Sequence, residues 1–98
     1  MKNPISNLNK AFDSRVRLGI MAVLLVNDWV EYTEIKSLLD LTDGNLASHI
    51  SALEKLDYIE VRKQFVGKKP NTSYKVTRIG KKAFQEHLNA LEALVKRN

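Results

Sequence analysis

The basic residues of the chain are concentrated in one segment whose composition suits binding to a polyanion. Residues 61–85 contain no Asp or Glu and carry eight positive charges. These charges belong to Arg62, Lys63, Lys68, Lys69, Lys75, Arg78, Lys81 and Lys82. Residues 31–60 have the reverse balance, with seven acidic residues against two lysines. A segment whose charges are all positive favours nucleic acid as the partner. The alternative is a basic surface that contacts only solvent.

Small polar residues form a second group, with the spacing of one helix face. If residues 43–56 are helical, Leu46, Ile50 and Leu53 lie on one stripe at spacings of four and three, which marks the core face. The other side then carries Gly44, Asn45, Ser48, Ser51 and Lys55. Small polar side chains allow close approach to a duplex and hydrogen bonds to base edges or phosphates. The alternative is a plain solvated face.

The elements that must position these residues begin with two predicted helices. Three apolar residues have the spacing of one face of a short N-terminal helix: Ile5, Leu8 and Phe12. Ser14 can cap a second helix over residues 15–27, which is apolar on more than one side, as expected for a central buried element. A short β-prone stretch follows, made of Trp29, Val30 and Tyr32.

Two further helices are predicted in the middle of the chain. Thr33 suits the N-cap of a helix over residues 34–39, and Thr42 suits the N-cap of the helix over residues 43–56. Only two residues separate them, which leaves room for nothing but a tight turn. Two helices joined in this way, the second longer and amphipathic, form a helix-turn-helix pattern over residues 33–56.

A β-hairpin with a basic tip is predicted next. Residues 59–66 alternate with the period of a strand, residues 67–72 form a loop with turn residues at both ends, and residues 74–76 alternate as a second strand. Thr77 can cap a long final helix over residues 78–97. A helix-turn-helix followed at once by such a hairpin is the winged-helix arrangement.

Several stretches of the sequence resemble a known family. They are FDSRVRL at residues 12–18, LEKLDYI at residues 53–59, GKKPNTSYKVT at residues 67–77 with Gly80, and AFQEHLNALE at residues 83–92. In these stretches the chain resembles the small stand-alone winged-helix transcriptional regulators of the MarR/ArsR type. The resemblance implies a winged-helix fold, a homodimer and transcriptional regulation.

Two positions depart from the pattern of that family. Asp57 stands where the family usually has a Gly, at the left-handed residue that ends the recognition helix. Asp tolerates the left-handed conformation less well than Gly but better than most residues. Asn71 stands where the wing of the family more often carries Arg, so this wing has one fewer charge for the minor groove.

The final helix carries an apolar stripe with the spacing of a coiled-coil seam. The stripe consists of Phe84, Leu88, Leu91 and Val95, with Leu94 beside it. A final helix has little remaining domain to cover, so we expect a second copy of the chain to cover it. The N-terminal residues Ile5, Leu8 and Phe12 are expected to join this interface. The alternative is that the stripe packs on its own domain.

We therefore predict a single winged-helix DNA-binding domain over residues 1–98, mainly α with a small β-hairpin wing. It is a winged helix-turn-helix with N- and C-terminal dimerisation helices. The wing spans residues 59–77 and the C-terminal dimerisation helix residues 78–97. The residues expected to read bases are Gly44, Asn45, Ser48 and Ser51. The residues expected to contact phosphates are Lys55, Arg62, Lys68, Lys69 and Lys75.

Other functional classes find little support in the sequence. The chain has no cysteine, which excludes disulfides, thiolate catalysis and cysteine-based metal sites. No phosphate loop, paired catalytic carboxylate or nucleophile–base motif is present, so we expect no enzyme and no cofactor. His49 and His87 have too few potential ligands near them in sequence for a metal site. No export signal or membrane span is evident, which predicts a soluble cytoplasmic protein.

The hypothesis that these features favour is a homodimeric transcriptional regulator that binds duplex DNA in a sequence-specific manner. Its recognition helix would enter the major groove, and its basic wing would lie on the phosphate backbone. The alternative is a winged-helix module for protein–protein contact, for which the basic wing is incidental. Many relatives of the MarR type bind small molecules, and the sequence indicates no position for such a site.

Overall fold

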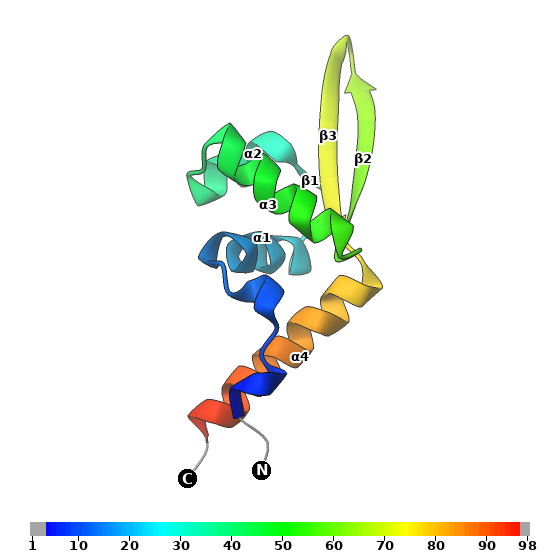
Figure 1. Ribbon diagram of the computed structural model, residues 1–98. Helices are drawn as coiled ribbons and strands as arrows, with labels where there is room; N and C mark the ends of the chain where they lie inside the picture. The colour runs from blue at the N-terminus through cyan, green and yellow to red at the C-terminus, as the bar shows by residue number, and fades with distance from the viewer. Residues whose placement is uncertain (1–3, 97–98) are drawn as a thin grey trace.

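The computed structural model describes residues 4–96, which form four α-helices, two short 3₁₀-helices and three strands (Figure 1). In chain order these are η1 (Pro4–Asn7), η2 (Lys10–Phe12), α1 (Arg15–Leu25), β1 (Val30–Glu31), α2 (Tyr32–Leu39), α3 (Asp43–Lys55), β2 (Ile59–Val66), β3 (Lys69–Val76) and α4 (Arg78–Val95). The predicted fold class, mainly α with a β-hairpin wing in a winged helix-turn-helix, is confirmed.

Three of the predicted helix caps are present in the structure. The hydroxyl groups of Ser14, Thr42 and Thr77 accept hydrogen bonds from backbone N–H groups of the first turns of α1, α3 and α4. The donor–acceptor distances are 3.3, 3.2 and 2.9 Å. Each hydroxyl satisfies a donor that has no partner within its own helix, so these three residues fix where the helices begin.

The predicted cap at Thr33 is wrong, because α2 begins one residue before it. Glu31 pairs with Ser73 in the sheet, and the chain passes directly from this strand residue into the helix at Tyr32. Glu31 occupies the N-cap position and makes no side-chain capping bond. The strand thus sets the start of α2, and Tyr32 belongs to the helix instead of the β-prone stretch.

The N-terminal segment is not the single helix that its apolar spacing predicts. It forms two 3₁₀ turns, η1 and η2, which are separated by Leu8 and by Asn9, the latter in an extended conformation. The Asn9 side chain accepts a hydrogen bond from the N–H of Ala11 at 2.9 Å and so caps η2.

Helix α1 ends at Leu25, two residues earlier than expected. Beyond this end, the side-chain amide of Asn27 donates to the carbonyl of Val23.

The sheet is antiparallel with the order β1-β3-β2, and its long hairpin corrects the predicted loop over residues 67–72. Val66 pairs with Lys69, so only Gly67 and Lys68 connect the strands. Gly67 has a φ of 68°, the conformation that a type II′ hairpin turn requires at its first position. Pro70 lies beyond the end of β1, where β3 has no neighbour on that side, a position in which a strand tolerates proline.

The core lies between helices α1 to α3 and the inner face of the sheet, and it extends to the start of α4. Its most deeply buried side chains include Ile20, Leu24, Ile35, Leu46 and Leu53. The predicted core stripe of α3 is confirmed, since Ile50 is buried beside Leu46 and Leu53. The wing and α4 project from this body in opposite directions, giving overall dimensions of 57 × 25 × 21 Å (Figure 1).

Candidate nucleic-acid interface

The outer face of α3 is open to solvent along its whole length. Gly44, Asn45, Ser48, Ser51 and Lys55, the candidates from the sequence, are all exposed. A Cβ atom placed on Gly44 would meet no other atom within 4 Å, so nothing in the chain covers the first turn of the helix. We name the surface formed by these five residues the α3 face.

The N-terminus of α3 is tied to α2 through Asp43. The Asp43 carboxylate lies 3.0 Å from the ammonium group of Lys36, and the Tyr32 hydroxyl donates to the backbone and carboxylate oxygens of Asp43 at 3.2 and 3.4 Å. Desolvation, followed by the nearby Asp43 carboxylate, raises the pKa of Tyr32 above its ordinary value of 10.0, so the phenol remains a donor. Lys36 partly offsets the negative charge of Asp43 at the exposed start of α3.

α3 ends in a Schellman motif, although Asp57 stands where the family usually has a glycine. Asp57 has a φ of 61°, as the resemblance implies for this position. The N–H of Tyr58 donates to the carbonyl of Leu53 and the N–H of Asp57 to that of Glu54. The Thr77 hydroxyl and N–H donate to the carbonyls of Asp57 and Tyr58 at 2.5 and 3.0 Å. The end of α3 is therefore fixed to the junction of wing and α4.

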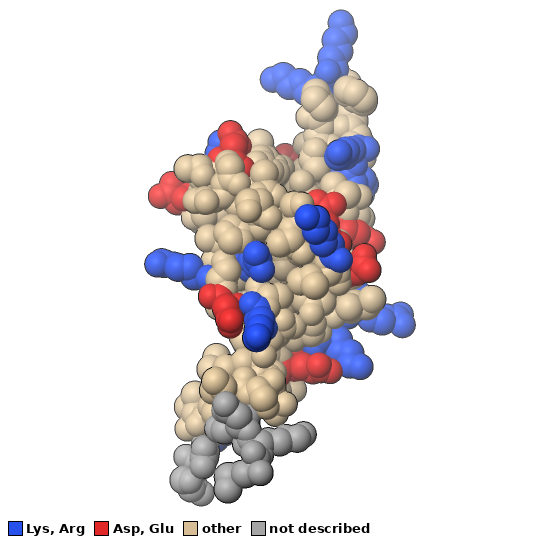
Figure 2. All heavy atoms as spheres, in the orientation of Figure 1, with Lys and Arg blue, Asp and Glu red and all other residues tan. Residues whose placement is uncertain are grey.

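The outer end of the wing carries the lysines predicted to contact phosphates. Lys68 lies in the hairpin turn, Lys69 begins β3, and every residue from 60 to 70 is exposed. Figure 2 shows Lys and Arg side chains gathered at this end of the molecule, away from the acidic side chains of the body. The hairpin holds these charges outside the body, on an element joined to the end of α3.

Arg62 and Lys75 occupy a different position from the lysines of the turn. They surround Trp29, with the Arg62 guanidinium 4.4 Å and the Lys75 ammonium 5.8 Å from its ring centroid. Lys75 also pairs with Asp28 at 3.3 Å. These contacts are cation–π and ionic interactions within the chain. The sequence gives no sign of them, because Trp29 approaches Arg62 and Lys75 only through the pairing of β1, β3 and β2.

A second contact missed from the sequence lies where α1 meets α3. The Nε of Arg17 donates to Nδ1 of His49 at 3.1 Å, and a terminal nitrogen of Arg17 donates to the carbonyl of Ala11 at 3.5 Å. His49, which lies beside the core stripe of α3, thus has a hydrogen-bond partner on α1.

Among residues 4–96, no group of three or more His, Cys, Asp or Glu side chains is placed to hold a metal ion.

Two residues expected at a dimer interface lie in the core of their own chain, so that expectation is wrong for them. Phe12 and Phe84 are 1% and 5% exposed, and their rings meet edge to face at 5.2 Å. The ring of His87 packs on Phe12 at the same distance, and its Nδ1 accepts a hydrogen bond from the N–H of Asn9 at 3.0 Å. The N-terminal turns cover these rings, leaving no surface for a partner.

The remainder of the predicted stripe on α4 is at the surface. Leu88, Leu91 and Val95 are 39%, 47% and 77% exposed, whereas Leu8 and Leu94 are half-buried. Ile5 is exposed on η1, which lies along the same helix. We name the surface formed by Leu88, Leu91 and Val95 the α4 stripe.

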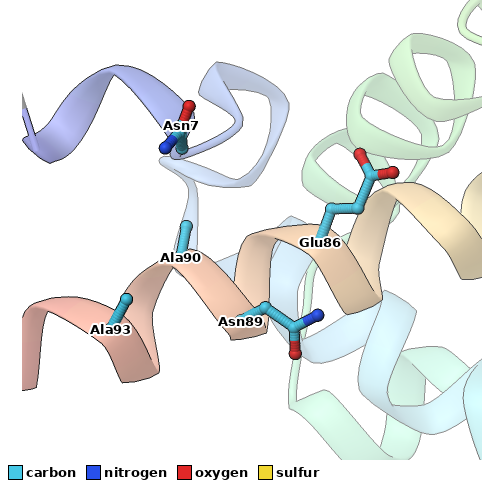
Figure 3. A pocket seen from close by; sticks show the side chains of 5 residues that line it. All are labelled: Asn7, Glu86, Asn89, Ala90 and Ala93. Carbon is cyan, nitrogen blue, oxygen red and sulfur yellow. The ribbon is translucent and has the colours of Figure 1, made fainter. Parts of the chain in front are cut away.

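An open hollow of about 410 Å³ lies between η1 and another part of α4 (Figure 3). Its lining consists of Asn7, Glu86, Asn89, Ala90 and Ala93. The lining is mixed, since amide and carboxylate groups stand beside two alanines, and no cluster of like charges or aromatic side chains lines it. The hollow therefore gives no indication of a particular ligand.

The sequence and fold of this chain are similar to those of known proteins. Residues 16–95 correspond to the winged helix DNA-binding domain family. The chain belongs to this family. An uncharacterised protein of Methanocaldococcus jannaschii is 34% identical over 87 residues, which cover 89% of this chain and 95% of that protein. Within residues 4–96, this winged-helix chain has no helix long and apolar enough to cross a membrane.

This winged-helix protein also resembles solved structures of other proteins. A transcriptional regulator homologue from Pyrococcus horikoshii superposes with a TM-score of 0.75 at 32% identity, over 88% of this chain and 90% of that one. AbfR of Staphylococcus epidermidis, solved bound to DNA, superposes with a TM-score of 0.77 over 96% of this chain and 68% of that one. At 15% sequence identity, the similarity between this chain and AbfR shows a common fold and nothing more. The predicted resemblance to small winged-helix regulators is thus confirmed.

Proposed function

We propose that this winged-helix protein is a cytoplasmic homodimer that binds duplex DNA sequence-specifically and regulates transcription. The observation that carries the proposal is the joint placement of the α3 face and the lysine-tipped wing. A helix with small polar side chains on its open side stands beside a projecting basic hairpin. DNA bound to AbfR, which shares the fold, supports duplex DNA as the partner.

In this proposal the first half of α3 enters the major groove. Gly44 lets the helix approach closely, while Asn45, Ser48 and Ser51 supply donors and acceptors for base edges or phosphates. Lys36 and Tyr32 hold the Asp43 carboxylate, which reduces its repulsion of the backbone. The Schellman motif at Asp57 fixes the angle between α3 and the wing, so that both reach one duplex.

The phosphate contacts fall into two groups in this proposal. Lys68, Lys69 and Lys55 are exposed and form none of the ion pairs that residues 4–96 contain, so they can displace counterions from DNA directly. Arg62 and Lys75 already contact Trp29, and Lys75 also pairs with Asp28. We expect these two residues to contribute less to affinity than the lysines of the turn.

Titration of labelled duplex and single-stranded DNA by fluorescence anisotropy, at several salt concentrations, tests the proposal. We expect tighter binding to the duplex and an affinity that falls linearly with salt on logarithmic axes, by a slope of about 0.9 for each phosphate that the protein neutralises. Absence of duplex binding at low salt would favour the alternative, a winged helix that contacts protein.

A further inference from the structure

Tyr58, shortly after the end of α3, is held on its backbone by two elements. Its N–H donates to the carbonyl of Leu53 at 3.1 Å in the Schellman motif of α3, and its carbonyl accepts a hydrogen bond from the N–H of Thr77 at 3.0 Å, just before α4. Gly80, in the first turn of α4, lies so close to this carbonyl that a Cβ there would overlap it. The backbone of Tyr58 therefore connects the end of α3 to the start of α4.

The side chain of Tyr58 contacts a third part of the chain, the N-terminal turns. Its hydroxyl oxygen accepts a hydrogen bond from the side-chain amide of Asn9 at 3.0 Å, and its ring packs on Phe12 with the ring centroids 5.6 Å apart. Asn9 and Tyr58 are 49 positions apart in the sequence. Both residues are half-buried, so competition from water for this bond is reduced.

Asn9 is in turn fixed to α4. Its backbone N–H donates to Nδ1 of the buried His87 at 3.0 Å, while its side-chain oxygen caps η2 through the N–H of Ala11. The ring of His87 packs on Phe12, which also meets Phe84. The N-terminal turns and α4 thus form one unit that extends away from the body (Figure 1). We name this unit, which consists of η1, η2 and α4, the α4 arm.

The end of α3 therefore contacts the α4 arm at two separate points. One is the direct approach of Tyr58 to Gly80, and the other runs through Asn9 to His87, about 10 Å further along α4. A single point of contact leaves two rigid elements free to rotate about it, whereas two points fix the angle between them. A hydrogen bond is directional, so it restricts this angle more tightly than the packing of rings does.

Small changes in this angle are large on the scale of DNA. α4 contains 18 residues, which correspond to about 27 Å of helix. A tilt of about 5° at its base would shift its far end, where the α4 stripe lies, by roughly 2 Å. In a symmetric dimer both copies would shift, and the total is about the rise of one base pair.

We propose that Tyr58 is a positioning residue for DNA binding. The hydrogen bond from Asn9 to its hydroxyl fixes the angle between α3 and the α4 arm, and thereby the spacing of the two half-sites that a dimer binds. This inference rests on the proposed function and assigns the choice of spacing to one side-chain contact. Removal of the bond leaves the α3 face, the wing and the α4 stripe unchanged. It therefore affects the preference for spacing and not the binding of one half-site.

The test compares Tyr58→Phe with Tyr74→Phe in anisotropy titrations. Tyr58→Phe removes the hydroxyl that Asn9 contacts and keeps the ring beside Phe12. Tyr74→Phe is the matched control, because it removes the same atom from a buried residue whose hydroxyl has no hydrogen-bond partner within residues 4–96. Three duplexes serve as probes. They carry two half-sites at the spacing that wild type selects, the same half-sites with one base pair inserted between them, and one half-site alone.

Wild-type protein should bind the selected spacing about tenfold more tightly than the spacing with one added base pair. Tyr58→Phe should reduce this ratio about threefold to tenfold, the effect expected from the loss of one hydrogen bond. Its affinity for one half-site should stay within about twofold of wild type. Tyr74→Phe should retain the wild-type ratio.

Variants of Asn9 test the same bond from its other side. Asn9→Ala should reduce the ratio as Tyr58→Phe does, and the two changes together should reduce it no further, because the bond is already absent. Asn9→Asp should retain the wild-type ratio. Its carboxylate can cap η2 and can accept a hydrogen bond from the Tyr58 hydroxyl, so the connection is kept with donor and acceptor exchanged.

The outcomes separate this inference from the proposed function. If wild-type protein binds no duplex, the proposed function fails and this inference fails with it. If wild type binds both spacings equally, or Tyr58→Phe keeps the wild-type ratio, DNA binding stands and the inference is wrong. Equal weakening on all three duplexes would indicate loss of folded protein and would also overturn it. If Tyr58→Phe unfolds in thermal melting, Asn9→Asp and Asn9→Ala carry the comparison, and equal ratios for these two variants would contradict the inference.

Discussion

Two aspartates, Asp40 and Asp57, hold the backbone in the left-handed conformation at the ends of α2 and α3. Their φ values are 51° and 61°, and both helices end with the hydrogen bonds of a Schellman motif. The sequence predicted this geometry at Asp57 because the resemblance marks that position. Asp40 could be expected only to lie in a tight turn, since an aspartate alone does not specify a left-handed residue.

Replacement of Asp57 tests whether this conformation is strained. Asp57→Ala should lower the free energy of unfolding by about 1 kcal/mol, because a Cβ without a polar group disfavours the left-handed region. Asp57→Gly should not lower it, since glycine adopts that region freely. Chemical denaturation of the two variants measures the difference. Equal destabilisation by alanine and glycine would indicate that the aspartate side chain itself stabilises the turn.

Gly80 is required by a close approach of α4 to the end of α3. A Cβ at this position would overlap the backbone carbonyl of Tyr58, which accepts a hydrogen bond from Thr77. Gly80→Ala should therefore destabilise the protein by about 1–3 kcal/mol. Gly44→Ala is the matched control, because open space surrounds Gly44 in its helix, and alanine there should stabilise the fold slightly. Thermal melting of both variants should show shifts of opposite sign.

At the scale of the elements, local hydrogen bonding was easier to predict than pairing between distant segments. The caps at Ser14, Thr42 and Thr77 depend on one side chain and the next turn, and all three were predicted. The start of α2 was not, because it depends on the pairing of Glu31 with Ser73, more than forty residues away. The predicted loop over residues 67–72 was too long for the same reason, since the strand pairing continues through Pro70 up to the turn.

The lysines of the wing turn should act through phosphate contacts alone. Changing both Lys68 and Lys69 to Ala should weaken binding to all duplexes to a similar extent. It should also reduce the salt slope by roughly 0.9 for each phosphate that is no longer neutralised. Arg62→Ala should reduce the slope less, because Arg62 lies over Trp29 in the free protein. An unchanged slope for the double variant in anisotropy titrations would show that the wing does not touch the backbone.

At the scale of the whole molecule, we predict that the α4 stripe joins two copies of the chain. The structure changes the predicted energetics, because Phe84 already lies in its own core and Leu88 and Leu91 are less than half exposed. Each leucine can therefore contribute less than the 1.5–3 kcal/mol of a fully buried side chain. Of the N-terminal residues predicted to join the interface, Ile5 is exposed and Phe12 is buried. Phe84 could not be distinguished from the exposed residues of the stripe by sequence alone, since its spacing along the helix fits both the core-facing side and the exposed side.

Replacing Leu88 and Leu91 with Glu should yield a monomer in sedimentation. Two-fold symmetry would place four carboxylates in one apolar contact. Ile79→Glu is the matched control. Ile79 is 58% exposed and lies nine residues from Leu88, on the opposite side of α4. The control should stay dimeric. A double variant that stays dimeric, or a wild type that is monomeric at micromolar concentration, would show that another surface or none joins the chains.

Selection of bound sequences from a random duplex library, with wild type and Ser48→Ala compared, tests the central claim most directly. Ser48 is exposed on the α3 face, and removal of a base contact typically costs about 1–3 kcal/mol at one position. We expect wild type to enrich two inverted half-sites about one helical turn apart. Ser48→Ala should relax the preference at one base pair of each half-site. Enrichment of no sequence by wild-type protein, or the same preference in both proteins with half-sites at no fixed spacing, would contradict the account.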